Sequence, residues 1–124
     1  NETEAEELTG VKVDGPDAAR RAAAVLLGKG AKAVIVTLGE RGALLHMEGV
    51  SELVPAISAG KVVETTGAGD AFNGGFAAAL ARGDRPLDAV RFACAVAGIS
   101  VTRAGTAPSM PTLAEVEALL AAAR

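Results

Sequence analysis

Apolar residues recur along this chain with two different periods, and their order predicts its helices and strands. A short acidic stretch at residues 2–8 reads as a helix start, and the next apolar positions follow one helical face: Ala19, Ala22, Ala23, Leu26 and Leu27. Residues 33–38, AVIVTL, then form a continuous β-branched run that is typical of a strand covered on both faces. Glycine-bounded segments at residues 43–47 and 52–54 predict a small antiparallel edge beside it.

The second half of the chain also contains alternating strand-like and helix-like patterns. Residues 61–65 predict a short strand that leads into a glycine-rich turn, and small residues from 70 to 82 then predict a helix. Two more helices are expected at residues 86–102 and from Thr112 to the end, where Thr112 and Glu115 have the spacing of a capping box. Strands that alternate with helices, without repeats, predict an α/β fold in one domain spanning residues 1–124.

Composition and charge narrow the classes of function. Half of the 124 residues are hydrophobic, but only three are Phe and none is Trp or Tyr, so we expect a core of small and branched aliphatic side chains. The formal charge of -3, without any Lys/Arg cluster, argues against nucleic-acid binding. The apolar runs are too short to span a bilayer, and the single cysteine, Cys94, suits a reducing compartment. We therefore expect a soluble, cytoplasmic protein.

The run Gly67-Ala68-Gly69-Asp70 carries the clearest chemistry. It lies where a predicted strand meets a predicted helix, so its backbone amides and the helix dipole are suited to bind a phosphate. A carboxylate at the edge of such an anion site suggests a base that meets a neutral hydroxyl during phosphoryl transfer. The residues alone leave a second interpretation open, in which Asp70 only caps a helix that begins at Ala71.

The residues on both sides of Gly67-Ala68-Gly69-Asp70 extend this run into a longer motif. Residues 65–76, TTGAGDAFNGGF, resemble the signature of the ribokinase-like carbohydrate kinases, and Asn1-x-x-Glu4 and Thr37-Leu38-Gly39-x-Arg41-Gly42 are similar to two further landmarks of that family. The resemblance extends to about Pro111. It implies a three-layer α/β/α fold with a mainly parallel sheet and a small antiparallel hairpin edge. This chain would be its carboxy-terminal, nucleotide-binding part, and the upstream sugar-binding and lid half is expected to be missing.

The resemblance also implies roles for individual residues. Asp70 would be the catalytic base and touch the sugar, while Gly67, Ala68 and Gly69 would hold charge on the transferred phosphate. The implied ATP contacts are Asn1, Thr37, Leu38, Gly39, Glu40, Arg41, Gly42, Gly69, Asp70 and Cys94. Taken without the family, the Asn1 and Glu4 pair is a helix cap, residues 37–42 form a hairpin turn, and Cys94 is a small buried hydrophobe.

Two metal sites are implied in the same way. Glu4 would hold Mg²⁺ through water, and a monovalent cation, K⁺, would be bound mostly by main-chain carbonyls among Glu64, Thr66, Ser100, Arg103, Gly105 and Ser109. Glu64 stands where the family usually has an aspartate, so direct ligation by this longer carboxylate is left open.

The expected activity is ATP-dependent phosphorylation of a sugar hydroxymethyl group, with D-ribose as the first candidate because residues 1–6, 91–93 and 101–105 look closest to the ribokinase branch. Fructokinase-like or nucleoside kinase-like specificity is the alternative within the family. A non-catalytic nucleotide-binding fragment is the alternative from another class. The expected partners are ATP and a small sugar. A homodimeric complete enzyme is compatible with the resemblance, although no residue argues for an oligomeric state.

Overall fold

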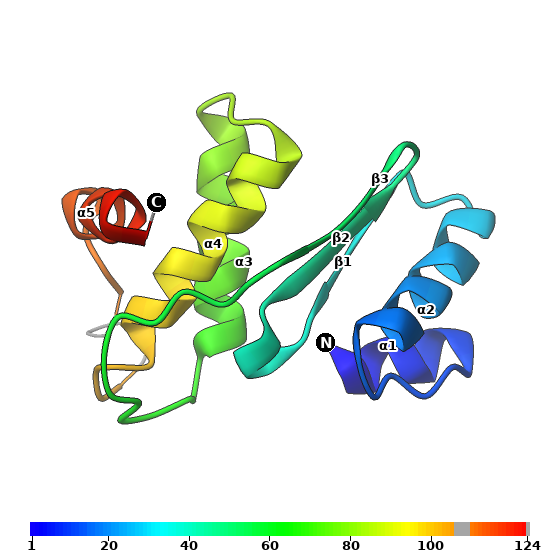
Figure 1. Ribbon diagram of the computed structural model, residues 1–124, viewed down its shortest axis with the longest axis horizontal. Coiled ribbons are helices and arrows are strands. Elements are labelled where there is room, and N and C mark those ends of the chain that lie inside the picture. The colour runs from blue at the N-terminus through cyan, green and yellow to red at the C-terminus, as the bar shows by residue number, and fades with distance from the viewer. Residues whose placement is uncertain (106–109, 124) are drawn as a thin grey trace. The chain divides into compact units, whose positions relative to one another are not determined.

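A computed structural model describes residues 1–105 and 110–123, which divide into two compact units, Asn1–Pro55 and Ala56–Arg124. The first unit contains helices α1 (Glu2–Thr9) and α2 (Pro16–Gly28) and strands β1 (Ala33–Thr37), β2 (Ala43–Met47) and β3 (Val50–Val54). A 3₁₀ turn, η1 (Gly39–Arg41), joins β1 to β2. The strands form an antiparallel sheet in the order β1-β2-β3. Within this unit, both helices lie on the same side of the sheet (Figure 1).

Local sequence accounts for the helices of the first unit. Pro16 and Asp17 stand in the first turn of α2, where a fixed φ and a negative charge both favour a helix start. Gly10 ends α1 in the left-handed conformation, with φ at 75°, which glycine adopts without strain. These signals set the helix ends before any tertiary contact is considered.

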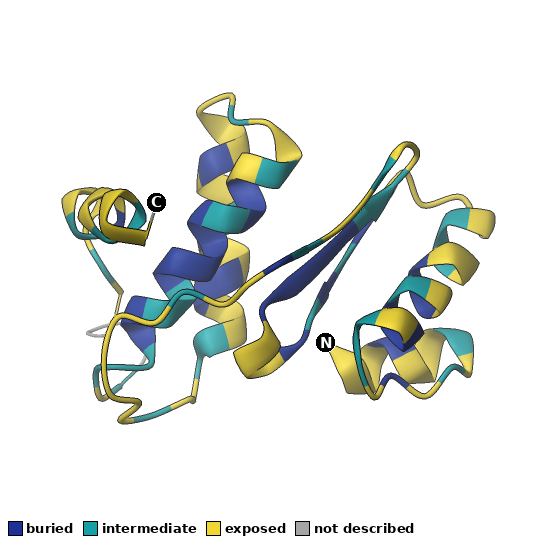
Figure 2. Ribbon diagram, viewed as in Figure 1, coloured by how far each residue is buried: buried dark blue, intermediate teal, exposed yellow. Residues whose placement is uncertain are grey.

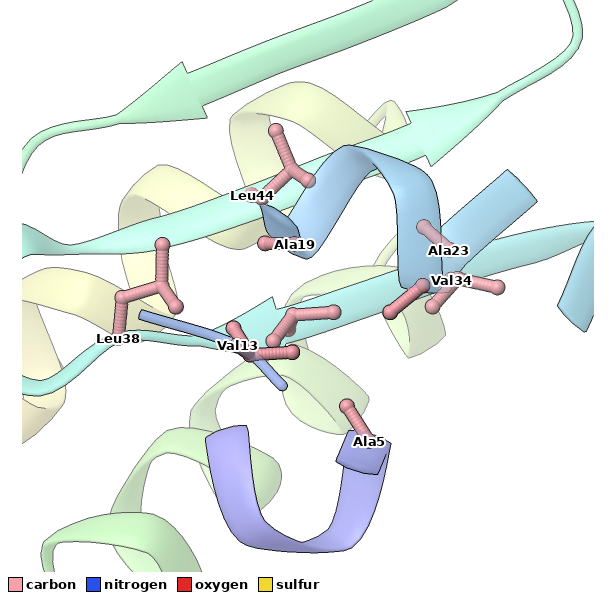
Figure 3. Close-up of a cluster of buried hydrophobic side chains, with 9 residues drawn as sticks. Ala5, Val13, Ala19, Ala23, Val34, Leu38 and Leu44 are labelled. Atoms are coloured by element: carbon pink, nitrogen blue, oxygen red, sulfur yellow. The ribbon is translucent and has the colours of Figure 1, made fainter. Parts of the chain in front are cut away.

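The core of the first unit is built from alanine, valine and leucine. Ala5, Ala19, Ala23 and the strand residues Val34 and Leu44 point toward one another (Figure 3). The buried side chains lie on alternate positions of β1: Val34 and Val36 are buried, whereas Ile35 is only half-buried. Both helices of this unit pack on one face of the sheet, and the expectation of a strand covered on both faces stays a prediction.

The second unit contains helices α3 (Ala68–Ala81), α4 (Pro86–Ser100) and α5 (Leu113–Ala123). Buried residues follow one stripe of α3 and most of α4 (Figure 2), and their core includes Phe92, Ile99 and Val116. Gly75 of α3 lies against Val96 of α4, so a Cβ there would come within 2.9 Å of the valine side chain. The absence of a side chain lets the two helices approach closely.

The segment before α3 differs from the prediction. Residues 61–65 form no strand, because the amides of Val63 and Glu64 both donate to the carbonyl of Val101, just past the end of α4, at 2.7 and 3.1 Å. Two donors that converge on one acceptor do not make a strand ladder. The β-branched composition of this segment misled the prediction, since its partner is the end of a helix.

The α/β class and the antiparallel edge agree with the prediction. The helices at 2–9, 16–28, 86–100 and 113–123 also lie where the sequence periodicity placed them. The described strands pair only antiparallel, so the mainly parallel sheet and the three layers stay predictions. Within the part of the chain that the structure describes, no helix combines the length and the apolar character needed to cross a membrane.

Candidate functional site: an anion-binding loop at the start of α3

The glycine loop opens α3 and leaves amides without acceptors. Gly67 is the N-cap residue and has φ at 81°, a conformation that favours glycine. The Ala68 amide donates to the Thr65 carbonyl at 3.1 Å, whereas the amides of Gly69 and Asp70 have no backbone acceptor among the described residues. A Cβ on Gly69 would meet nothing within 4 Å. This open helix start is therefore suited to an anion.

Asp70 lies in the first turn of α3 and not at its cap. The helix begins at Ala68, two residues earlier than the sequence predicted, and no side chain caps it. The alternative in which Asp70 caps a helix starting at Ala71 was therefore wrong, because the left-handed Gly67 already starts the helix. The Asp70 side chain is exposed, and it accepts no hydrogen bond from any described residue. The carboxylate is open to a ligand bound at the loop.

The candidate cation residues come from two separate segments, and the structure brings part of them together. Glu64 Oε2 accepts a hydrogen bond from the Gly105 amide at 2.9 Å. The Ser100 carbonyl accepts from the Arg103 amide at 3.2 Å, and the Ser100 hydroxyl donates to the Ala97 carbonyl at 2.9 Å. The structure thus joins Glu64 to residues 101–105, while Thr66 is exposed and Ser109 lies outside the described residues.

Asn1 and Glu4 form a capping box at the start of α1. The Glu4 amide donates to Asn1 Oδ1 at 2.9 Å, and Glu4 Oε1 lies 2.9 Å from the Asn1 amino nitrogen. Both side chains are exposed, and they line a hollow of about 220 Å³ together with residues 34–36 of β1. The interpretation of this pair as a helix cap was thus correct, and a ligand contact from the same side chains stays a prediction.

The turn at residues 37–42 is a tight loop stabilised by its own backbone. Leu38 accepts from the Arg41 amide at 3.1 Å, and its own amide donates to the Gly42 carbonyl at 2.8 Å. Gly39 and Gly42 have φ at 58° and 100°, so both positions favour glycine. The Leu38 side chain is buried, while Glu40 is exposed, and Thr37 pairs with Ala43 across the sheet. The side chain of Leu38 is therefore not available to a ligand, and its amide is already bonded to Gly42.

Arg41 has a structural partner that the sequence did not predict. Its Nη1 donates to the Asp14 carbonyl at 2.9 Å, and a Cβ on Gly15 would lie 3.0 Å from the same nitrogen. The bond ties the turn to the segment before α2. The other guanidinium donors of this exposed side chain still suit a phosphate.

Cys94 lies on α4 and is buried. Burial raises the pKa of its thiol to about 11, a shift that the nearby Arg91 partly offsets. A neutral, inaccessible thiol agrees with its interpretation as a small hydrophobe and gives no nucleophile. On the same helix, Arg91 Nε is buried without a hydrogen-bond partner among the described residues, which the sequence pattern did not indicate.

The structure divides the predicted site residues between the two units. Asn1, Glu4 and residues 37–42 belong to the first unit, and residues 64–70, Cys94 and residues 100–105 belong to the second. Sequence reasoning missed one contact in the second unit, the ion pair between Arg103 and Glu115. The capping-box spacing of Glu115 gave no sign of it, because the partner comes from another segment.

A glycine-opened helix with an unpaired aspartate suits a phosphate-handling class of protein. Comparison with known families shows the family. The pfkB family carbohydrate kinase model matches residues 1–113. The chain therefore belongs to the pfkB family of carbohydrate kinases, which confirms the resemblance based on residues 65–76.

Individual relatives are ribokinases and other kinases of this family. Ribokinase from Haemophilus influenzae is 44% identical over 115 residues, which cover 93% of this chain and 37% of that protein. The structure of Arabidopsis thaliana ribokinase complexed with ribose and ATP has a TM-score of 0.91 at 39% identity and covers 97% of this chain and 39% of its own. Phosphofructokinase-2 from Escherichia coli in complex with potassium has a TM-score of 0.86 at 28% identity, over 100% of this chain and 40% of its own.

These comparisons confirm the ribokinase-like α/β fold class. They also show that the chain spans only 37–40% of these relatives.

Proposed function

We propose that this chain is the carboxy-terminal, nucleotide-binding part of an ATP-dependent sugar kinase. The observation that carries the proposal is the start of α3, where the amides of Gly69 and Asp70 have no described acceptor beside an exposed, unpaired Asp70 carboxylate. Those amides suit the γ-phosphate of ATP, and the carboxylate suits the proton of an attacking hydroxyl. Membership of the pfkB family supports the same reaction.

In the proposed reaction the protein forms no covalent bond to the substrates, and it acts by positioning them and by stabilising charge. ATP would supply the phosphoryl group, and Mg²⁺ bound to ATP would offset the negative charge of the phosphates. Asp70 removes the proton of the sugar hydroxymethyl group as its oxygen attacks the γ-phosphorus of ATP, the bond from that phosphorus to the β-γ bridging oxygen breaks, and ADP leaves. The amides of the glycine loop stabilise the charge on the transferred group. The Ala68 amide donates to the Thr65 carbonyl at 3.1 Å. It can stabilise the transferred phosphoryl group only if this hydrogen bond breaks.

The described residues fit the nucleotide better than they fit a directly bound divalent metal. An open helix start with unpaired amides suits a phosphate. Among residues 1–105 and 110–123, no three Asp, Glu, His or Cys side chains gather to hold a metal ion. Glu4, whose carboxylate already caps α1, is therefore proposed to act on Mg²⁺ through water.

A monovalent cation site is proposed around Glu64 and residues 100–105. The carbonyl-rich end of α4 offers the oxygen ligands that such cations use, and the related phosphofructokinase-2 binds potassium. Glu64 Oε2 is already occupied by the Gly105 amide. We therefore expect this carboxylate to shape the site more than to ligate the cation through that oxygen.

D-ribose is the proposed first substrate because the relatives described above include ribokinases, one of them bound to ribose and ATP. Fructokinase-like and nucleoside kinase-like specificity are the alternatives within the family. The homodimer and the cytoplasmic location stay predictions. A non-catalytic nucleotide-binding fragment is the second candidate function, and the short span of this chain relative to those kinases favours it for the isolated 124 residues.

The test is ADP release from ATP and Mg²⁺ with a panel of D-ribose, D-fructose and a nucleoside, in K⁺ or in a bulky organic cation. Both the complete protein and the 124-residue chain are assayed. We expect ribose-dependent, K⁺-stimulated release from the complete protein. Nucleotide binding without release by the isolated chain would support the fragment interpretation of that chain. A complete protein that binds ATP but transfers phosphate to none of the three acceptors would overturn the kinase proposal.

A further inference from the structure

The carboxylate of Glu115 serves two partners at once. Glu115 Oε1 accepts from the Thr112 amide at 3.0 Å, and the Glu115 amide donates to Thr112 Oγ1 at 3.2 Å, which completes the capping box of α5. The same carboxylate pairs with the Arg103 guanidinium, with Nη1 3.5 Å from Oε1 and Nη2 bonded to Oε2. A helix cap needs only an acceptor, so the charge is available to hold Arg103.

Arg103 belongs to a segment that is bound on its other side to the approach of the glycine loop. The Val101 carbonyl accepts from the amides of Val63 and Glu64, and Glu64 Oε2 accepts from the Gly105 amide. Glu64 stands three residues before Gly67, which starts α3. Residues 101–105 therefore link α5 to the chain that enters the anion-binding loop.

Helix α5 is a suitable anchor because its first turns are packed. Val116, next to Glu115, is 1% exposed and belongs to a core cluster with Phe92 and Ile99 of α4. Leu119 and Leu120 add partly buried contacts to that cluster. Packing holds the Glu115 backbone in place, so its carboxylate presents a fixed target to Arg103.

We propose that Glu115 is a positioning residue that holds residues 101–105 through Arg103 and, through the Gly105–Glu64 hydrogen bond, sets the entry to the anion-binding loop. The proposal rests on the proposed kinase function, since residues 100–105 carry the proposed cation carbonyls. It adds α5, a helix outside the predicted site, to the parts that shape this site.

The two roles of Glu115 can be separated by substitution. Glu115→Gln keeps an oxygen for the Thr112 amide but removes the charge that Arg103 meets. Because the side chains of Arg103 and Glu115 are 34% and 39% exposed, solvent screens the pair, and we expect changes of about fivefold. Glu117→Gln is the matched control, since it removes an exposed charge from the same helix.

The first measurement is amide hydrogen exchange of Val63, Glu64 and Gly105 in the complete protein, whose protection depends on the hydrogen bonds of residues 101–105. We expect about fivefold faster exchange in Glu115→Gln and none of this change in Glu117→Gln. The second measurement is the K⁺ concentration for half-maximal turnover, which we expect to rise about fivefold while kcat at saturating K⁺ is retained. Arg103→Gln should reproduce the faster exchange and the higher K⁺ requirement without touching the cap, and these two readouts carry the test if Glu115→Gln does not fold.

Each outcome decides the proposal. Exchange that is equal in Glu115→Gln and Glu117→Gln would overturn it, as would faster exchange with an unchanged K⁺ response in an active enzyme, since Glu115 would then be only a structural cap. Faster exchange in a protein that shows no phosphoryl transfer would support the link from α5 to the loop. That result would reject the proposed kinase function instead.

Discussion

At the scale of single residues, Asp70 is the clearest case of a side chain whose proposed role rests on its position. It stands in the first turn of α3, exposed and unpaired among the described residues. Asp88 occupies the equivalent first-turn position of α4 and is also exposed. Each aspartate lies near the positive end of its own helix dipole. Their surroundings differ, because only Asp70 follows a glycine loop.

This comparison yields a prediction for catalysis. Asp70→Asn should lower turnover of the complete enzyme by a factor of about 10² or more and leave ATP affinity nearly unchanged, because a general base acts in the transition state. Asp88→Asn should change neither quantity. Turnover and nucleotide titration measure the two effects, and an equal loss of both in Asp70→Asn would point to a structural role.

Cys94 gives a second prediction at this scale, for stability against pH. Burial raises the pKa of its thiol from 9.0 to about 11, so the unfolded chain releases the proton at lower pH than the folded chain. The unfolded state therefore binds fewer protons between about pH 9 and 11, and stability should fall across that range, by at most about 3 kcal/mol. Below pH 9 the thiol should contribute no pH dependence.

Denaturant unfolding of the wild type and of Cys94→Ala at several pH values measures this effect. The difference between the two proteins isolates the contribution of the thiol from that of the other titratable groups. A difference that stays constant from pH 8 to pH 11 would mean that the thiol is not buried in solution.

At the scale of elements, glycines determine how closely helices and loops approach in the second unit. A Cβ on Gly98 of α4 would clash with the Ile57 carbonyl oxygen, which belongs to the backbone and cannot move away by a change of rotamer. At Gly75 the obstacle is the Val96 side chain at 2.9 Å, and at Gly74 nothing lies within 4 Å. The space for a Cβ therefore increases from Gly98 to Gly75 to Gly74, and all three glycines lie within helices.

Alanine at each position should separate packing from helix propensity. Gly98→Ala should destabilise the protein by about 1–3 kcal/mol, because the segment at Ile57 must move. Gly75→Ala should have a smaller effect, since Val96 can adjust its rotamer. Gly74→Ala should stabilise α3 by about 0.5–1 kcal/mol, because alanine is the better helix former. Chemical denaturation gives all three values, and a neutral Gly98→Ala would show that Ile57 does not approach α4 in solution.

The element scale also shows where sequence patterns sufficed. The amphipathic spacing at α2 and the capping signals at Asn1 and Thr112 predicted helices that the structure contains. Residues 61–65 did not follow their β-branched composition, because the amides of Val63 and Glu64 donate to the Val101 carbonyl and not to another strand. Propensity describes what a segment can do alone, and tertiary partners decide between the alternatives.

At the scale of the whole molecule, the hydrophobic residues form two clusters that share no member. Val36 and Leu44 lie in the cluster of the first unit, where they are direct cross-strand partners, and Val116 lies in the cluster of the second. Substitutions in separate clusters should act independently, whereas cross-strand partners share one cavity.

The prediction is a pair of double-mutant cycles. Val36→Ala and Val116→Ala should add within about 0.5 kcal/mol in the free energy of unfolding. Val36→Ala and Leu44→Ala should deviate from additivity by more than that, because each enlarges the space left by the other. Strong coupling between Val36 and Val116 would contradict the division of the core into two clusters.

The sequence by itself determined the family of this protein and indicated the chemistry that is proposed for it. The run at residues 65–76 carries the anion-binding loop and Asp70 within one short stretch of chain, and such local motifs can be recognised without a fold. Helix spacing and caps are likewise local, so the helices could be predicted.

Tertiary structure decided what depends on partners distant in the chain. It placed Gly67 at the N-cap of α3, so Asp70 lies in the first turn of the helix and does not cap it. It also brought together Glu64 and Gly105, and Arg103 and Glu115. These contacts join residues separated by 41 and 12 positions, and the spacing of neither pair indicates that its members meet. Which acceptor or counterion a polar group meets depends on which groups lie nearby in the folded chain. The periodicity of the sequence does not contain this information.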